Sequence, residues 1–176
     1  MRSSFRRAFS TASRKTFFAL ASPPGKAGVA VYRVSGPDAL TAYRALVQPH
    51  PTSTLRTGEQ SVSPKPWHLH RCSVCYPGTE TIIDDGLAVF FRGPRSYTGL
   101  DTLELQLHSG RAVSAAILQA LSSVPGLRPA EPGEFTRTAL RNGKIDLTQA
   151  EGLRDLLDAE TEAQRKLARA VASVRP

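Results

Sequence analysis

Short apolar runs separated by turn-forming residues predict the first elements of the chain. Residues 17–21 (FFALA) form an apolar run of the length of a buried strand, and Pro23 and Pro24 prevent its continuation. Residues 29–35 (VAVYRVS) predict a second strand. The Gly-Pro-Asp sequence that follows suits the start of an amphipathic helix, which we expect to run to about Val47.

A strict alternation of apolar and polar residues marks the middle of the chain. In residues 101–108 (DTLELQLH), three leucines share one face of a predicted strand, and Glu104, Gln106 and His108 share the other. One face is therefore suited to packing and the other to binding. Apolar residues at helical spacing then predict a helix over 111–124.

Two further strands are predicted at 67–76 and 86–92, separated by a Pro-Gly turn and an acidic corner at 84–86. The first of them contains Cys72 and Cys75 as C-S-V-C, together with two histidines. In an extended strand Cys75 points away from the face shared by Cys72 and the histidines, which argues against a closed zinc site. A redox C-x-x-C motif opens a helix, whereas this one precedes a turn. We therefore interpret both cysteines as strand residues, with zinc or redox chemistry as the alternative.

The last third of the chain predicts helices. A short helix is expected over 133–142, ended by Gly143, a residue that accepts the left-handed conformation. A longer helix follows over 148–174, with Thr148 and Glu151 matching a capping box. Its apolar stripe is broken, and such a helix needs a partner. The whole pattern predicts an α+β fold with a mixed or antiparallel sheet and packed helices.

The charge is concentrated at the N-terminus. The 176 residues carry a formal net charge of +8. The first fifteen contain no acidic residue and contribute Arg2, Arg6, Arg7, Arg14 and Lys15. This Arg- and Ser-rich opening is typical of a cleavable mitochondrial presequence, so we expect residues 1–15 to direct the protein to the mitochondrial matrix; a basic RNA-binding arm is the alternative. No apolar stretch approaches the roughly 18 residues of a membrane span, so no membrane role is expected.

Three polar residues stand where a purely structural role does not obviously need them. Arg33 shares a strand face with valines, where a guanidinium is unfavourable unless it pairs with an anion. The alternative is an arginine at the end of a strand that reaches solvent. Glu104 either faces solvent or pairs with the N–H groups of a flat heteroaromatic ring. Lys144 follows a helix end, where it is either solvated or meets an anion. His108 with Ser109 is a further catalytic possibility, but it has no third member.

Three long segments resemble the MnmE/TrmE tRNA-modification GTPases, including their mitochondrial members. They are PPGKAGVAVYRVSG (23–36), GPRSYTGLDTLELQLHSG (93–110) and the segment 125–159, which contains EPGEFTRTALRNGKIDLTQAEGL. The resemblance implies an N-terminal domain over 16–142, similar to the folate-binding part of the glycine-cleavage T-protein. It also implies that residues 143–176 are the first helix of a truncated helical domain.

The resemblance also implies a ligand. Arg33, Glu104 and Lys144 match family positions that bind 5-formyltetrahydrofolate, a tetrahydrofolate derivative, with Glu104 at the pterin edge and the two cations near the folate. Full-length relatives modify C5 of the tRNA wobble uridine with the flavoprotein MnmG (GidA), and their N-terminal domains form homodimers. The expected partners are therefore a second copy, an MnmG-type flavoprotein and, indirectly, tRNA.

Departures from the family pattern leave other functions open. Ala27, Leu100 and Ser109 replace the usual Gly, Glu and Gly, which puts the loop shapes and the folate affinity in question. The chain contains no G-x-x-x-x-G-K-[ST] phosphate loop, so we expect no GTP hydrolysis by the family mechanism. The alternatives to a folate-binding, dimerising module are an interaction protein that has lost the ligand and a fragment of a full-length GTPase.

Overall fold

The computed structural model describes residues 16–50 and 63–172, so the predicted presequence over 1–15 lies outside the described residues. The strands are β1 (Thr16–Leu20), β2 (Ala27–Ser35), β3 (Val47–Pro49), β4 (His70–Cys75), β5 (Ile82–Phe91), β6 (Thr102–Ser109) and β7 (Leu127–Pro129). The helices are α1 (Ala39–Leu46), α2 (Arg111–Ser123), α3 (Glu134–Arg141), α4 (Leu147–Leu157) and α5 (Glu162–Ala172).

Within the described residues the strands form one seven-stranded sheet in the order β3-β4-β5-β6-β2-β1-β7. Neighbouring strands are antiparallel except β1 and β7, which pair in parallel. The α+β fold with a mixed sheet is confirmed. The three-residue strands β3 and β7 were not predicted because such short segments carry no periodicity.

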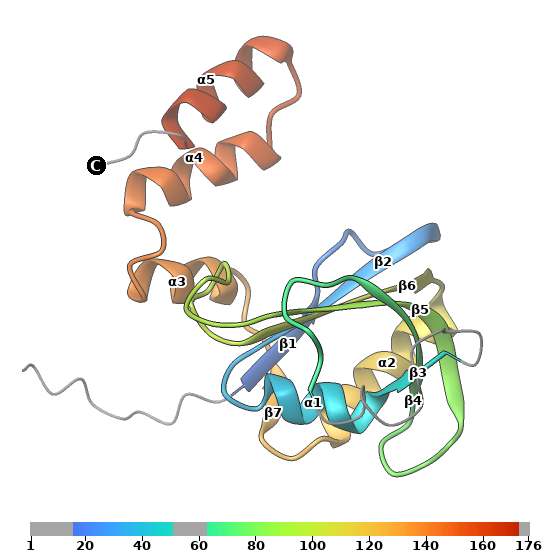
Figure 1. Cartoon of the computed structure of the whole chain (residues 1–176). Coiled ribbons are helices and arrows are strands. Elements are labelled where there is room, and N and C mark those ends of the chain that lie inside the picture. The colour runs from blue at the N-terminus through green and yellow to red at the C-terminus, as the bar shows by residue number, and fades with distance from the viewer. Residues whose placement is uncertain (1–15, 51–62, 173–176) are drawn as a thin grey trace, which may run out of the picture.

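Helices α1 and α2 pack on one face of the sheet, which we call the covered face (Figure 1). The leucines of the alternating segment, Leu103, Leu105 and Leu107, point into this core and are at most 2% exposed. Tyr32 and Val34 of β2 join them there with no exposed surface. The opposite face, which carries Arg33, Glu104, Gln106 and His108, is the open face.

The acidic corner predicted at 84–86 is wrong: these residues lie inside β5, paired with β4. Asp85 accepts a hydrogen bond from Ser73 Oγ at 2.6 Å, and Asp84 accepts bonds from His108, so both carboxylates find partners within the sheet. Gly86 is required because a Cβ there would lie 2.2 Å from the Gln106 carbonyl oxygen. The turn between β4 and β5 is the predicted Pro-Gly turn, with Gly78 at φ +73°.

The single helix predicted over 148–174 is also wrong, since the structure has two helices, α4 and α5, packed side by side (Figure 1). The capping box belongs to Asp146 and Gln149 instead of the predicted pair. A second N-terminal cap, in which Thr161 Oγ1 accepts from Gln164 N at 3.2 Å, begins α5. Gly152 allows the close approach, because a Cβ there would lie 2.7 Å from Ala172 N. The partner that the apolar stripe needs is therefore α5.

The helices do not provide a membrane span. Among the described residues, none of them combines the length and the apolar composition needed to cross a bilayer.

Candidate functional site

Arg33 and Glu104 meet on the open face because β2 and β6 pair antiparallel with these two residues in register. Arg33 Nε donates to Glu104 Oε1 at 2.7 Å, and the two side chains are 28% and 17% exposed. Glu104 Oε2 accepts no hydrogen bond within the part of the chain that the structure describes, and the terminal amino groups of Arg33 donate none there. The pair therefore retains both acceptor and donor capacity toward a ligand.

A cavity of about 180 Å³ lies over this ion pair. Its floor is formed by Arg33, Glu104 and Thr102 of the sheet, and Phe91 of β5 adds an aromatic wall. Pockets that enclose a whole drug-sized ligand measure roughly 300–1,000 Å³. The cavity is thus suited to one flat ring of a ligand whose remainder lies outside it.

Trp67, which completes the aromatic wall, was not identified from the sequence as a site residue. The pattern placed it at the start of a strand, but in the structure it precedes β4 with φ +64°, the left-handed region that costs an L-residue about 1–2 kcal/mol. Its backbone is held by a hydrogen bond from Trp67 N to Phe90 O at 2.8 Å. No sequence pattern indicated a role for Trp67. The signal is structural: a bulky residue in the left-handed conformation beside a cavity points to a functional position.

The loop 93–99 closes the cavity with Tyr97 and Thr98. Asn142 Nδ2 donates to the Thr98 carbonyl oxygen at 2.6 Å. Lys144 Nζ donates to the Pro94 carbonyl oxygen at 2.8 Å. Lys144 therefore lies against the loop that closes the cavity without lining the cavity itself. The structure thus brings Arg33 and Glu104 together and places Lys144 at the 93–99 loop.

His108 lies farther along the open face of β6 and interacts with Asp84. Its Nδ1 is 2.9 Å from Asp84 Oδ1, and its backbone N–H donates to Asp84 Oδ2 at 2.8 Å. The hydrogen bond to Asp84 raises the pKa of His108 above its ordinary value, with the charge of that carboxylate acting in the same direction. Ser109 Oγ donates to Gly25 O at 2.5 Å, so the hydroxyl is used to hold the 22–26 loop and not to meet the imidazole.

Sequence comparisons place the chain among proteins of known family. Residues 16–144 match the family described as the GTP-binding protein TrmE N-terminus. The chain belongs to the TrmE N-terminal family. It is 52% identical over 151 residues to the tRNA modification GTPase MnmE of Parvibaculum lavamentivorans, covering 86% of this chain and 32% of that protein.

Two animal proteins named as 5-taurinomethyluridine-[tRNA] synthase subunit GTPB3, mitochondrial, are also similar. The Danio rerio protein is 47% identical over 156 residues and the Homo sapiens protein 46% identical over 156 residues. These matches cover 87% and 89% of this chain but 28% and 30% of the relatives. The chain thus spans about a third or less of the length of the curated relatives it matches.

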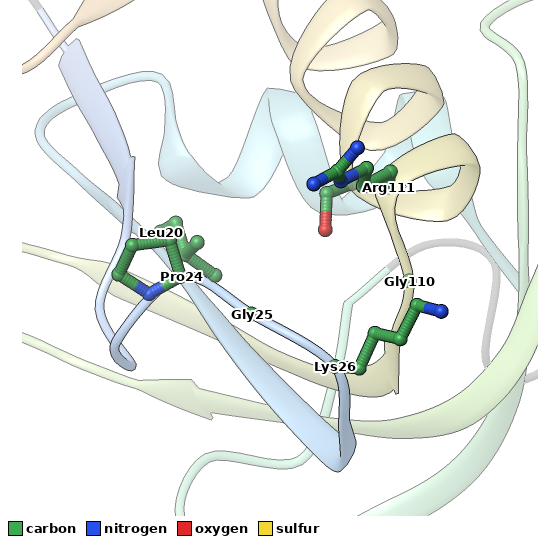
Figure 2. A pocket seen from close by; sticks show the side chains of 7 residues that line it. Leu20, Pro24, Gly25, Lys26, Gly110 and Arg111 are labelled. Atoms are coloured by element: carbon green, nitrogen blue, oxygen red, sulfur yellow. The ribbon is translucent and has the colours of Figure 1, made fainter.

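A larger cavity, of about 540 Å³, lies elsewhere in this TrmE N-terminal domain (Figure 2). It is lined by Leu20, Pro24, Gly25, Lys26, Gly110, Arg111 and Ser114. Figure 2 shows Lys26 on one side and Arg111 at the start of α2 on another. This cavity contains no carboxylate and none of the three residues selected from the sequence.

The two cysteines of this TrmE N-terminal domain are strand residues of β4, as predicted. Cys72 has no exposed surface and Cys75 is 1% exposed. Burial raises the pKa of the Cys72 thiol to about 12, and the nearby Asp85 carboxylate adds to this effect. A thiol with so high a pKa is almost entirely protonated at neutral pH, which disfavours both metal ligation and thiolate chemistry.

Proposed function

We propose that this TrmE N-terminal domain binds a tetrahydrofolate derivative such as 5-formyltetrahydrofolate. The observation that carries the proposal is the Glu104 carboxylate held at the floor of an aromatic-walled cavity, with Oε2 accepting no hydrogen bond from the described residues. The pyrimidinone half of a tetrahydropterin is flat and presents adjacent N–H groups, which match a carboxylate acceptor. The volume of the cavity agrees with a ring of this size and not with the whole ligand.

The two cations have different parts in this proposal. Arg33 fixes the Glu104 carboxylate through Nε and keeps its terminal amino groups for the ligand. Lys144 donates to Pro94 O, which uses one of the three donors of its ammonium group, so the others are available to a carboxylate of the folate tail outside the cavity. We infer that the bound folate extends from the cavity past the 93–99 loop toward Lys144.

Calorimetry with 5-formyltetrahydrofolate tests the proposal. Wild-type protein is expected to bind, and Glu104→Ala is expected to bind at least about tenfold more weakly because charged hydrogen bonds contribute about 1.5–3 kcal/mol. Gln106→Ala is the matched control: it lies on the same face of the same strand outside the cavity and should bind like wild type. An absence of binding heat from folded wild-type protein, or equal affinity of Glu104→Ala, would overturn the proposal.

The wider context of this binding is the modification of the tRNA wobble uridine. It is supported by the relatives, which are named as tRNA modification GTPases or as 5-taurinomethyluridine-[tRNA] synthase subunits. Mitochondrial location is supported by the two animal relatives named as mitochondrial. A fluorescent fusion of residues 1–20 should enter mitochondria, and a cytosolic signal would contradict the predicted presequence.

Assembly is the third part of the proposal. We infer that the domain forms a homodimer and acts with an MnmG-type flavoprotein, with tRNA contacted indirectly. The sheet domain exposes Val29 at 57% and Ile82 at 51%, and these apolar side chains are available to a partner surface. Sedimentation equilibrium should give twice the monomer mass, and a monomer at all accessible concentrations would contradict the dimer.

A further inference from the structure

Trp67 is the single tryptophan of the chain, and its position in the structure is unusual for a large apolar residue. Its side chain is 47% exposed, so it does not belong to the core. Its backbone adopts φ +64°, which L-residues rarely do. A glycine or an asparagine would satisfy this backbone with less strain, so the structure of the turn does not by itself explain an indole at this position.

The indole ring is nevertheless held in place. Its centroid lies 4.9 Å from that of Phe91 in an edge-to-face arrangement with an interplanar angle of 71°. The guanidinium carbon of Arg95 lies 5.7 Å from the ring centroid. Both contacts are of the kind that orient aromatic rings in proteins. The ring is therefore pre-oriented at the cavity before any ligand arrives.

The same cavity brings this ring close to the ion pair of the open face. Phe91, Trp67 and Tyr97 surround the space above Arg33 and Glu104. A carboxylate at the floor selects the hydrogen-bonding edge of a ring, and aromatic walls select its flat faces. A cavity of about 180 Å³ leaves little room between these groups for anything other than a single flat ring system.

We propose that Trp67 is a ligand-binding residue whose indole contacts the flat ring of the ligand directly. This inference rests on the proposed function of the cavity and goes beyond it, since it assigns the aromatic contact to one residue. The contact has a direct spectroscopic signature, because Trp67 is the only indole in the chain.

Fluorescence of the wild-type protein tests the contact without a mutation. Titration with 5-formyltetrahydrofolate should quench the Trp67 emission saturably, with the same midpoint as the calorimetric titration. Free N-acetyltryptophanamide at the same concentration corrects for absorption of light by the folate. Calorimetric saturation with no change in the corrected emission would overturn the role of Trp67 and leave the folate proposal in place, whereas no binding in either measurement would remove both.

Two substitutions test how much the indole contributes to the affinity. Trp67→Ala should weaken binding about tenfold or more, the range found when an aromatic partner of a stacked base is removed, and Trp67→Phe should stay within about fivefold of wild type. Leu69→Ala is the matched control, because Leu69 is 50% exposed, lies close in sequence and does not line the cavity. Equal affinity of Trp67→Ala and Leu69→Ala, with both folded by circular dichroism, would overturn the inference. If Trp67→Ala does not fold, Trp67→Phe and the wild-type titration decide.

Discussion

The two faces of strand β6 differ in what their side chains contact: one face is buried under helices, and the other carries two ion pairs that reach solvent. On the covered face, Leu103, Leu105 and Leu107 are at most 2% exposed and pack beneath α1 and α2. On the open face, Glu104 pairs with Arg33 and His108 pairs with Asp84, and these side chains keep contact with solvent. Alternate residues of the same strand should therefore respond to substitution in opposite ways.

The largest expected effect comes from the covered face. Leu105→Ala should lower the free energy of unfolding by about 2–5 kcal/mol, because it removes fully buried methyl groups and leaves a cavity under the helices. Chemical denaturation should show a lower midpoint with an unchanged slope. Gln106→Ala, the next residue on the open face, should stay within about 0.5 kcal/mol of wild type. Equal losses for both variants would contradict the division between the two faces.

The open face should show the reverse result when its ion pair is removed. Glu104→Leu should abolish folate binding while changing the free energy of unfolding by no more than about 1 kcal/mol. The reason is that Arg33 remains 28% exposed, so water can solvate its guanidinium when the carboxylate is lost. Thermal melts alongside calorimetry measure both quantities. A loss of stability as large as that of Leu105→Ala would show that the pair is mainly structural.

The same comparison explains how much could be predicted from the sequence. The alternation of leucines with Glu104, Gln106 and His108 predicted the strand and its buried side, because successive side chains of a strand point to opposite faces. Arg33 was singled out because it shares a strand face with valines, where a guanidinium is unfavourable without an anion. What periodicity cannot supply is the partner across the sheet: the registry of β2 with β6, which joins Arg33 to Glu104, became visible only in the fold.

Other features escaped prediction for physical reasons that differ. Asp84 and Asp85 looked like a turn because isolated acids disfavour strands, but cross-strand hydrogen bonds satisfy them. The break between α4 and α5 depends on the second cap at Thr161, and the interruption of the apolar stripe was not interpreted as the end of a helix. Trp67 reaches the cavity through a left-handed backbone conformation, which no pattern of apolar residues indicates.

A smaller effect is expected from the loop that closes the cavity. Asn142→Ala removes the hydrogen bond to the Thr98 carbonyl and should weaken folate binding about fivefold, since one hydrogen bond contributes about 1 kcal/mol. Calorimetry measures the change. Gln48→Ala is the control, because that amide also donates to a loop carbonyl, Thr79 O at 3.5 Å, but far from the cavity in sequence and outside its lining. Equal affinity for the two variants would show that the loop needs no support from Asn142.

The smallest effect concerns His108 at the exposed end of the open face. Asp84 raises the pKa of His108 in the folded protein, so the pair stabilises the fold at pH values below the ordinary histidine pKa of about 6.5. This contribution is lost as the pH rises through the higher native pKa. Because the imidazole is 71% exposed, the change in stability should be slight, and NMR titration of the ring protons is the sensitive measurement. Asp84→Asn should lower the pKa of His108 toward the ordinary value. If His108 of the wild-type protein already titrates at the ordinary value, the hydrogen bond to Asp84 does not stabilise the protonated imidazole in solution.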